Sequence, residues 1–340
     1  MLRWRIPGVS IIRTRFVLIQ CVLSPGAALV ILLDSRMRKP KLPRVRTCVI
    51  FNPAARGDKA RHFRAQLDKI GRAASLKMTT CVGDARTLAG EAVCEGFEVI
   101  VAAGGDGTLN EVLNGIGDVP DGFERAGLGV LPMGTVNVFA RELRIPLQLE
   151  EAWKVVLQGK SAHIDLGCAE AGSANGLQRR WFAQLAGAGL DARAIELLNW
   201  DLKKRIGPLA YVYAGLKALL EKKRRMTAAG VNGNLEGELV LVGNGRLYGG
   251  NFRTFEQAEM NDGLLDVCVF PNVNLFTLLR CAGPLLLKGT LPANCVRRFQ
   301  ASEFTLDCAD PASFELDGEL AGALPVRFSV ARQRLRVIVP

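Results

Sequence analysis

The chain has 340 residues, of which 49% are hydrophobic and 23% charged, and its formal net charge is +11. This length is sufficient for two domains with separate cores, and the absence of internal repeats and low-complexity segments excludes a repeat architecture. The nine cysteines include no CxxC pair and only two histidines are present, His62 and His163. These counts argue against a disulfide framework, a histidine-rich metal site and a histidine-centred triad, and they favour the reduced thiols of a cytoplasmic protein.

The positive charge is concentrated at the start of the chain. Residues 1–46 contain ten Arg and Lys residues and a single acid, Asp34, which leaves only +2 for residues 47–340. The folded body is therefore nearly neutral, so we expect no nucleic-acid partner.

The same leader contains an uncharged run, Phe16–Leu33, with basic residues on both sides. Three interpretations are open. The run could span a membrane, although Gln20 and the Ser-Pro-Gly sequence at 24–26 weaken its middle. It could be a signal peptide, which suits the cysteine-rich body that follows it poorly. We favour the third interpretation, a true start at Met37, with membrane anchoring as the second choice.

Strand and helix patterns then alternate up to about residue 158. We expect strands at 47–51, 77–81, 98–103 and 127–131, and helices at 60–70, 85–94, 109–116 and 149–157. Such alternation builds a parallel sheet covered by helices, with ligands at the carboxyl ends of the strands. Neither a GxGxxG fingerprint nor a GxxxxGK[ST] loop is present, which disfavours a dinucleotide fold and a Walker ATPase.

The most informative block is Gly104–Glu111 (GGDGTLNE), directly behind the apolar run Val99–Ala103. Its glycines let the backbone turn sharply and approach a ligand closely. Thr108 and Glu111 have the spacing of a capping box, which predicts a helix start there. Strand, turn and helix N-terminus together suit a phosphate. Taken alone, the block is equally compatible with a tight turn carrying a solvated Asp106.

After Ser161 the pattern changes to short strands, expected at 163–168, 181–186, 237–243, 263–270, 298–307, 313–316 and 327–339. A helical insertion at about 192–225 interrupts them. Many short strands with glycine turns predict a β-sandwich.

GGDGTLNE resembles the nucleotide-binding signature of the diacylglycerol kinase, sphingosine kinase and bacterial lipid kinase superfamily; a shorter GGDGT also occurs in NAD kinases. Further blocks resemble the lipid kinases in the expected order: Asn52–Gly57 (NPAARG), Leu131–Arg141 (LPMGTVNVFAR), Ile164–Gly167, Lys203–Leu209, Asn261–Asp266 and Asp317–Glu319. The resemblance extends from about Arg46 to the C-terminus.

The resemblance implies an α/β N-terminal domain with a parallel sheet, residues 46–160, followed by a C-terminal β-sandwich that receives the lipid, residues 161–334. Residues 335–340 would return to the first domain, and residues 1–45 would be the leader. The implied enzyme is an ATP-dependent, Mg²⁺-dependent lipid kinase that phosphorylates a hydroxyl of a lipid such as diacylglycerol. It would act in the cytoplasm at the inner face of the membrane, on a lipid at the membrane surface, with a homodimer as a further candidate assembly.

The nucleotide site implied by the resemblance combines three loops and one strand end. Its residues are Asn52, Pro53, Ala54, Ala55, Arg56, Thr79, Gly104, Gly105, Asp106, Gly107, Thr108, Leu109, Asn110 and Thr135. Arg56 would add a positive charge suited to phosphate. Thr80 is an alternative to Thr79.

Two carboxylates compete for the catalytic base. The resemblance favours Glu319 as proton acceptor and Asp106 as the group that orients metal and hydroxyl; the reverse assignment, with Asp106 as base, stays open. Asp317-Gly318 alone would predict a hairpin turn with a solvated Glu319.

A second, structural magnesium is implied at the loop Glu259–Leu264, held by Glu259, Asp262 and Leu264, since hard oxygen ligands suit this ion. The same residues also predict an ordinary Asn-Asp-Gly turn.

One departure from the family pattern bears on activity. The family has an acidic residue where this chain has Val138, and valine neither binds metal nor accepts a proton. NPAARG also lacks the hydroxyl residue that many relatives carry before the glycine. A catalytically inactive lipid-binding relative is therefore one alternative, and an NAD kinase-like enzyme, which shares GGDGT, is another. The apolar segment Leu209–Leu220, between basic clusters, predicts either a helix at an anionic membrane surface or a core helix.

Overall fold

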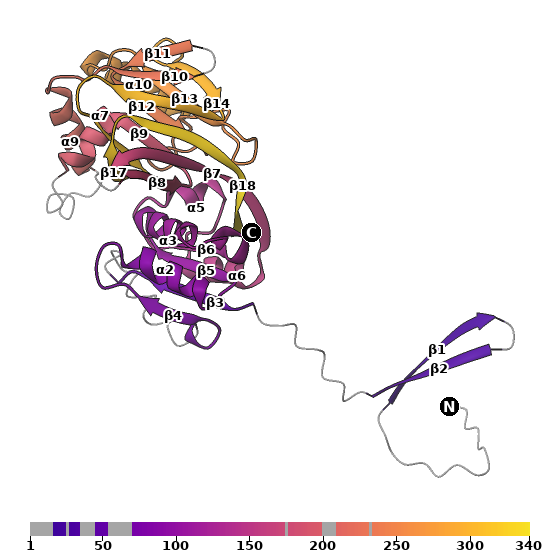
Figure 1. Ribbon diagram of the computed structural model, residues 1–340. Helices are drawn as coiled ribbons and strands as arrows, with labels where there is room; N and C mark the ends of the chain where they lie inside the picture. Colours follow the sequence, from indigo (N-terminus) through magenta and orange to yellow (C-terminus); the bar gives the residue numbers. More distant parts are fainter. Residues whose placement is uncertain are drawn as a thin grey trace, which may run out of the picture. The chain divides into compact units, whose positions relative to one another are not determined.

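The computed structural model describes residues 16–24, 27–34, 45–53, 70–173, 176–198, 209–230 and 233–340. The chain divides into two units, residues 1–45 and 46–340 (Figure 1). In the first unit β1 (Phe16–Ser24) pairs antiparallel with β2 (Ala27–Asp34), so the uncharged run forms a hairpin. Within the described residues, no helix has the length and apolar character needed to cross a membrane.

We expect a chain that begins at Met37 to fold and bind nucleotide as the full chain does. The second unit begins at Arg46 and its first strand at Thr47, so its core forms without the leader. Thermal unfolding and nucleotide titration of the two chains, side by side, test this. If the full chain stays in carbonate-washed membranes and the shorter one does not, the leader is an anchor instead.

The α/β part of the second unit is a parallel sheet with helices on it (Figure 1). Its strands are β3 (Thr47–Phe51), β4 (Ser75–Met78), β5 (Val99–Gly104) and β6 (Gly127–Pro132), in the order β6-β5-β3-β4. Its helices are α2 (Asp84–Cys94), α3 (Asp106–Asp118), α4 (Gly122–Arg125), α5 (Val138–Glu142) and α6 (Leu149–Gln158). Every residue of β3, β5 and β6 is buried, as expected for parallel strands covered on both faces. The helix expected at 60–70 lies outside the described residues except at its end.

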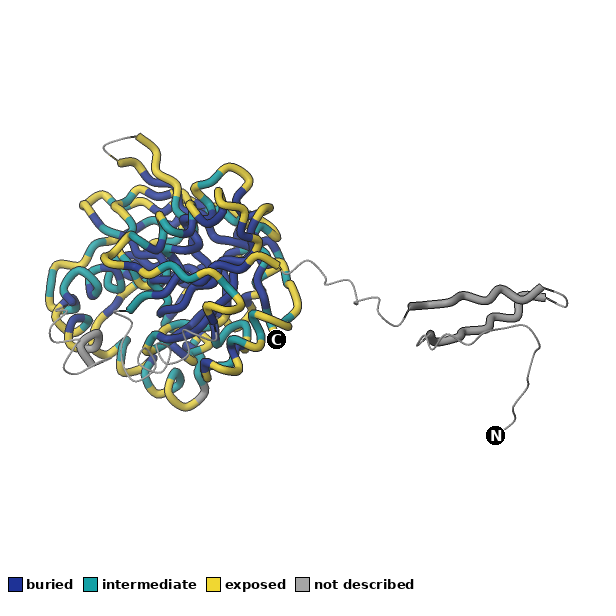
Figure 2. The backbone as a smooth tube through the Cα atoms, turned by 90° about the horizontal axis from the view of Figure 1, so that it is seen from below, coloured by how far each residue is buried: buried dark blue, intermediate teal, exposed yellow. Residues whose placement is uncertain are grey.

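The remaining strands form a two-layered sandwich. One layer continues the first sheet through β7 (Lys160–Ser173), β8 (Gly176–Phe182), β10 (Met226–Gly230), β11 (Gly233–Gly237), β15 (Glu303–Cys308) and β18 (Val326–Val339). The other is a six-stranded antiparallel sheet of β9 (Leu185–Gly189), β12 (Leu239–Gly243), β13 (Leu265–Phe270), β14 (Arg297–Ala301), β16 (Ser313–Leu316) and β17 (Glu319–Ala323). A buried core, in which Phe328 contacts the rings of Phe182, Phe304 and Phe314, lies between the layers. Figure 2 shows the buried residues gathered in the interior of the second unit. The predicted fold class is confirmed.

Two long strands join these parts into one sheet. β7 and β18 pair antiparallel along almost their whole length, and Val337 of β18 also pairs parallel with Leu128 of β6. Leu335, Val337 and Ile338 are buried in the same core as β3 and β5.

Several expected elements are divided or shifted. The strand expected at 181–186 ends as β8 at Phe182 and resumes as β9, and the helical insertion consists of α7 (Leu190–Glu196) and α9 (Leu209–Leu219) in its described parts. The helix α10 (Leu275–Lys288) was missed altogether. It contains Pro284, and a proline within an apolar run argues against a continuous helix there.

Candidate active site

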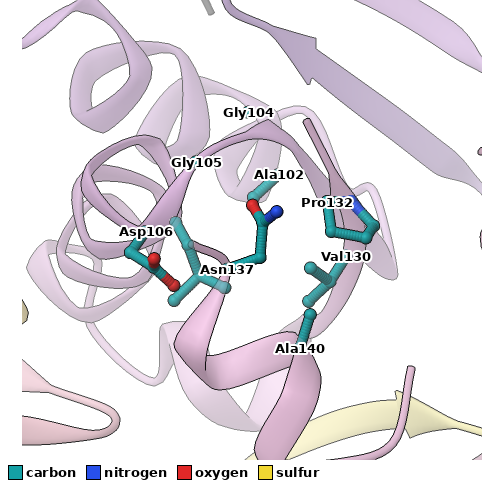
Figure 3. A pocket seen from close by; sticks show the side chains of 9 residues that line it. Ala102, Gly104, Gly105, Asp106, Val130, Pro132, Asn137 and Ala140 are labelled. Atoms are coloured by element: carbon teal, nitrogen blue, oxygen red, sulfur yellow. The ribbon is translucent and has the colours of Figure 1, made fainter. Parts of the chain in front are cut away.

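The predicted loops gather at the carboxyl ends of the parallel strands. From β3 the chain moves to β4 at the sheet edge and then returns to β5 on the other side of β3. Ligands in open α/β sheets bind where the strand order reverses in this way. A small cavity lies beside this point, between the loops that follow β5 and β6 (Figure 3), lined by Ala102, Gly104, Gly105, Asp106, Leu109, Val130, Pro132, Asn137 and Ala140.

Glycines are needed here for close approach. A Cβ on Gly105 would lie 3.2 Å from the Cα of Gly134, and a Cβ on Gly134 would lie 2.5 Å from the Cα of Gly105. The loop after β5 therefore packs backbone to backbone against the loop after β6. Asn137, with φ of 55°, closes the second loop, because its amide donates to the carbonyl of Gly134 and accepts from the N–H of Gly134.

The predicted capping box at Thr108 is wrong. α3 begins at Asp106, three residues before the expected Leu109, with Gly105 as its N-cap. Glu111 therefore falls in the second turn, where its carboxylate accepts from the N–H groups of Gly83 and Ala85 at 3.0 Å and caps α2 instead. The Thr108 hydroxyl accepts from Asn52 Nδ2 at 3.1 Å and links the loops after β3 and β5.

The other predicted nucleotide residues lie around these loops. Thr79 is buried and donates its N–H to Phe51, whereas the Thr80 hydroxyl donates to Asp84 at the start of α2. Thr135 is exposed in the loop after β6, and Pro53 follows β3. Ala54, Ala55 and Arg56 lie outside the described residues.

Asp106 faces the first turn of α5. Its Oδ1 lies 3.4 Å from the N–H of Phe139. Burial raises the pKa of Asp106, and the N–H groups of Val138 and Phe139 oppose that shift. Val138 thus contributes its backbone to the site, whereas its buried side chain offers no ligand.

Glu319 lies at the same end of α3 as Asp106. Asp317 and Gly318, with φ of 50° and 89°, form the two-residue turn between β16 and β17, and Glu319 pairs with Leu316 directly after it. A Cβ on Gly107 would overlap Glu319 Oε1, so the carboxylate lies against the first turn of α3. The predicted hairpin turn is therefore present, and the catalytic role of Glu319 stays a prediction.

Asp317 anchors this turn. The buried carboxylate accepts from the N–H groups of Ala183, Gln184 and Leu185 at 2.9–3.0 Å, and from Asn110 Nδ2 at 2.9 Å. Burial raises the pKa of Asp317, and these hydrogen bonds oppose the shift. The side chain of Asn110, expected at the nucleotide, thus ties α3 to the sandwich.

Two further residues were not predicted. Asn114 exchanges hydrogen bonds with the backbone of Trp181 and repeats the role of Asn110 one turn later. The spacing of the two asparagines on one helix was the available signal. Arg180 interacts electrostatically with Glu319, and its Nε is buried without a hydrogen-bond partner among the described residues. Burial lowers the pKa of Arg180. Nothing in its sequence context distinguished it.

Comparison with known proteins agrees with this arrangement. Residues 46–169 match the model of the diacylglycerol kinase catalytic domain, and residues 184–339 match that of the YegS C-terminal NAD kinase beta sandwich-like domain. A curated diacylglycerol kinase of Bacillus subtilis is 31% identical over 87% of this chain and 96% of its own length. The chain belongs to the diacylglycerol kinase superfamily. It is accordingly an enzyme of the lipid kinase class.

Other relatives extend the comparison. A diacylglycerol kinase of Staphylococcus aureus strain MRSA252 is 30% identical over 87% of this chain and 93% of its own. The crystal structure of a diacylglycerol kinase from Bacillus anthracis strain Sterne has the same fold, with a TM-score of 0.69, 23% identity, and coverage of 88% of this chain and 99% of that one.

The loop expected to hold a structural magnesium is a turn closed by protein groups. Asp262 Oδ1 accepts from the N–H of Leu264 at 2.8 Å, and Glu259 lies 3.5 Å from Arg246. Beneath the turn, buried Asp165 accepts from the N–H of Gly263. No group of three or more His, Cys, Asp or Glu side chains suited to a metal occurs within the described residues. Magnesium at this loop stays a prediction.

The residues at the start of α3 fit a magnesium ion better. Mg²⁺ in phosphoryl-transfer sites commonly takes one or two carboxylates and fills its other positions with phosphate and water. Asp106 supplies one carboxylate at the start of α3, and Glu319, the expected proton acceptor, lies against the same helix turn. A cation there would also offset the burial that raises the pKa of Asp106.

Two further carboxyl groups, those of Asp191 and Glu315, lie close to the Asp317-Gly318 turn. A Cβ on Gly187 would overlap Asp191 Oδ2 and lie 2.8 Å from Glu315 Oε1, so both oxygens meet over this glycine. Asp191 accepts from the Tyr248 hydroxyl at 2.5 Å, and Glu315 accepts from the N–H of Gly318 at 2.6 Å. Glu315 Oε1 is buried and has no hydrogen-bond partner among the described residues unless a proton is present between it and Asp191. A proton shared by the two carboxyl groups would form that hydrogen bond.

We expect Glu315→Gln to stabilise the protein at pH 8 and not near pH 4.5. Burial, followed by the nearby Asp191, raises the pKa of Glu315 well above its ordinary 4.5. As the pH rises above 4.5 the unfolded state loses this proton first, so stability falls until the folded pKa is passed. Glutamine keeps the shape of the protonated acid and does not ionise, so the gain at pH 8 should be ~1 kcal/mol or more.

Urea unfolding at both pH values measures this difference. Glu303→Gln is the matched control: Arg327 holds the pKa of this exposed carboxylate below its usual range, so that variant should not gain stability at pH 8. A Glu315→Gln protein less stable than the parent at pH 8 would contradict the shared proton.

Proposed function

We propose that this lipid kinase transfers the γ-phosphoryl group of ATP to a hydroxyl of a diacylglycerol-like lipid. The observation that carries the proposal is the placement of both Asp106 and Glu319 at the first turn of α3, beside two glycine loops. The relatives named diacylglycerol kinase, 30–31% identical over most of their length, support the substrate class.

The nucleotide binds at the carboxyl ends of β3, β5 and β6 in this proposal. The N-terminus of the 13-residue helix α3 presents N–H groups and a positive dipole end to the phosphates. Gly105 and Gly134 pack against each other but are each partly exposed, so a ligand can reach the backbone of both loops. Arg180 adds a positive charge near Glu319.

Glu319 is the proposed base and Asp106 the group that orients metal and acceptor. Bound Mg²⁺ would neutralise charge on the transferred phosphoryl group. Glu319 takes the proton of the lipid hydroxyl at its carboxylate, and the turn anchored by Asp317 holds that carboxylate in place. Burial of Asp106 keeps water from competing for its oxygens.

The membrane is the proposed source of the lipid, on the cytoplasmic side. α9 buries Ala214 and Ala218, whereas Tyr213, Leu216 and the following Leu220 are exposed. Basic residues 222–225 follow it directly. This combination suits a helix at an anionic surface better than an ordinary core helix.

An assay with labelled ATP against diacylglycerol, sphingosine, phosphatidylglycerol, undecaprenol and NAD tests the proposal. We expect diacylglycerol to be the best acceptor, in a reaction that requires Mg²⁺. Preferred phosphorylation of NAD would establish the NAD kinase-like alternative, which shares GGDGT. Lipid binding without turnover of any acceptor would establish an inactive relative. Val138 suggests this alternative, because it replaces the acidic residue of the family pattern.

A further inference from the structure

α10 is a well-defined helix on the outer surface of the sandwich. Asn274 caps its start by accepting from the N–H of Thr277 at 2.8 Å, and Gly289, with φ of 71°, ends it. On its inner side Leu278, Cys281 and Leu285 pack against the outer face of β12 and β13. The helix is thus held by a core of its own.

The outer side of α10 is almost entirely apolar. Its exposed residues are Leu275 (55% exposed), Phe276 (69%), Leu279 (66%), Leu286 (73%) and Leu287 (85%). At 3.6 residues per turn these five fall within about 120° of the helix circumference. Water normally faces the polar side of a surface helix, so five large apolar side chains on that side indicate that something covers them.

The charge around α10 indicates what covers it. Residues 267–302 contain no Asp or Glu and four basic residues, Arg280, Lys288, Arg297 and Arg298. Residues 47–340 as a whole carry only +2, so this segment is more basic than the body to which it belongs. Two copies meeting through α10 about a twofold axis would bring the same basic residues together, whereas an anionic lipid surface would neutralise them.

The basic run that follows α9 adjoins the start of α10. Val273, just before α10, donates its N–H to Glu238 at 2.6 Å, and Lys223 lies 3.5 Å from the same carboxylate. Leu219 of α9 also belongs to the core under α10. The exposed apolar residues of α9 and α10 thus lie on helices that cover the same sheet.

We propose that α10 inserts its outer face into the surface of an anionic bilayer and docks the protein there. The proposal deepens the proposed function, because it rests on a membrane lipid being the substrate. Leucine and phenylalanine side chains enter the boundary between headgroups and acyl chains, and the basic residues remain at headgroup level.

Co-sedimentation with vesicles, without ATP, tests the docking separately from the chemistry. We expect binding to vesicles of phosphatidylglycerol and phosphatidylcholine, and about tenfold or more weaker binding by the double variant Leu279→Glu, Leu286→Glu. Leu177→Glu is the matched control: this leucine is 73% exposed, like Leu286, but lies on β8, and its variant should bind as the parent does. Phosphorylation of a short-chain diacylglycerol in detergent micelles should be unchanged in all three proteins.

Two results would overturn the docking. One is undiminished vesicle binding by the double variant. The other is a parent protein that is dimeric in light scattering and becomes monomeric in the double variant, since a second copy would then cover α10. If the parent protein does not phosphorylate the short-chain diacylglycerol in micelles, the proposed function is contradicted, whereas the vesicle-binding result still holds.

Two further variants introduce no new charge into α10. Phe276→Trp places an indole on the outer face, and brominated phosphatidylglycerol in the vesicles should quench the added fluorescence. Arg280→Gln should weaken binding about fivefold, on the scale of one basic residue at an anionic surface, and make it less sensitive to salt. An unquenched indole at Phe276 in bound protein would show that another surface contacts the lipid.

Discussion

Replacing Glu319 with glutamine should lower lipid phosphorylation by about 10²-fold or more, the scale of general-base catalysis. Glutamine keeps the size and hydrogen bonding of the side chain but lacks the basic oxygen that lies against Gly107. ATP affinity should barely change, because Glu319 belongs to β17 in the sandwich and the proposed nucleotide loops follow β3, β5 and β6. Turnover of a saturating lipid and nucleotide titration measure the two quantities separately.

Glu303→Gln provides the matched control, since it makes the same change on β15 at an exposed carboxylate paired with Arg327. It should leave turnover unaffected. If Glu319→Gln retains near-full turnover while Asp106→Asn alone abolishes it, the assignment of the base is wrong. Asp106 would then be the proton acceptor, and the turn would have only a structural role.

Asp106→Asn should damage nucleotide binding and turnover together. The carboxylate is largely buried at the start of α3, so removing its charge weakens both the hold on Mg²⁺ and the orientation of the phosphates. We expect turnover to fall by about 10²-fold, the scale on which one electrostatic group in a water-poor site acts. Titrating nucleotide with and without Mg²⁺ should show that the variant has lost most of the metal-dependent part of the affinity.

The change Asp118→Asn controls for effects on the helix itself. Asp118 ends α3, is half exposed and pairs with Arg86. Its variant should keep Mg²⁺-dependent binding. Equal losses in both variants would mean that α3 is destabilised, and would remove the case for Asp106 as a metal-orienting group.

The parallel sheet could be predicted from the sequence because its strands are continuous apolar runs. Val99–Gly104 and Gly127–Pro132 lie within one residue of the expected ranges. Helix boundaries were less predictable. Thr108 and Glu111 have the spacing of a cap, but the helix already begins at Asp106, three residues before the expected start, and Glu111 accepts hydrogen bonds from α2 instead.

The candidate site shows the same division. The loops around Gly104 and Gly134 could be predicted from local sequence, because only glycine lets the two backbones approach each other this closely. The link between Asn110 and Asp317 joins residues 207 positions apart, and no local pattern carries such a contact. The shared role of Asp191 and Glu315 is also invisible in the sequence, since it depends on both side chains meeting over Gly187.

The course of β18 has a consequence for synthesis of the protein. Leu128 and Val337, 209 positions apart, are neighbours in one sheet, and Leu335 and Val337 complete the first core. A chain emerging from the ribosome therefore exposes the edge of β6 and an unfinished apolar core until residues 335–338 have emerged. Unpaired strand edges and apolar surface of this kind promote aggregation. Residues 46–160 produced alone should accordingly be insoluble, and supplying residues 161–340 as a separate chain should rescue them only when both are made together.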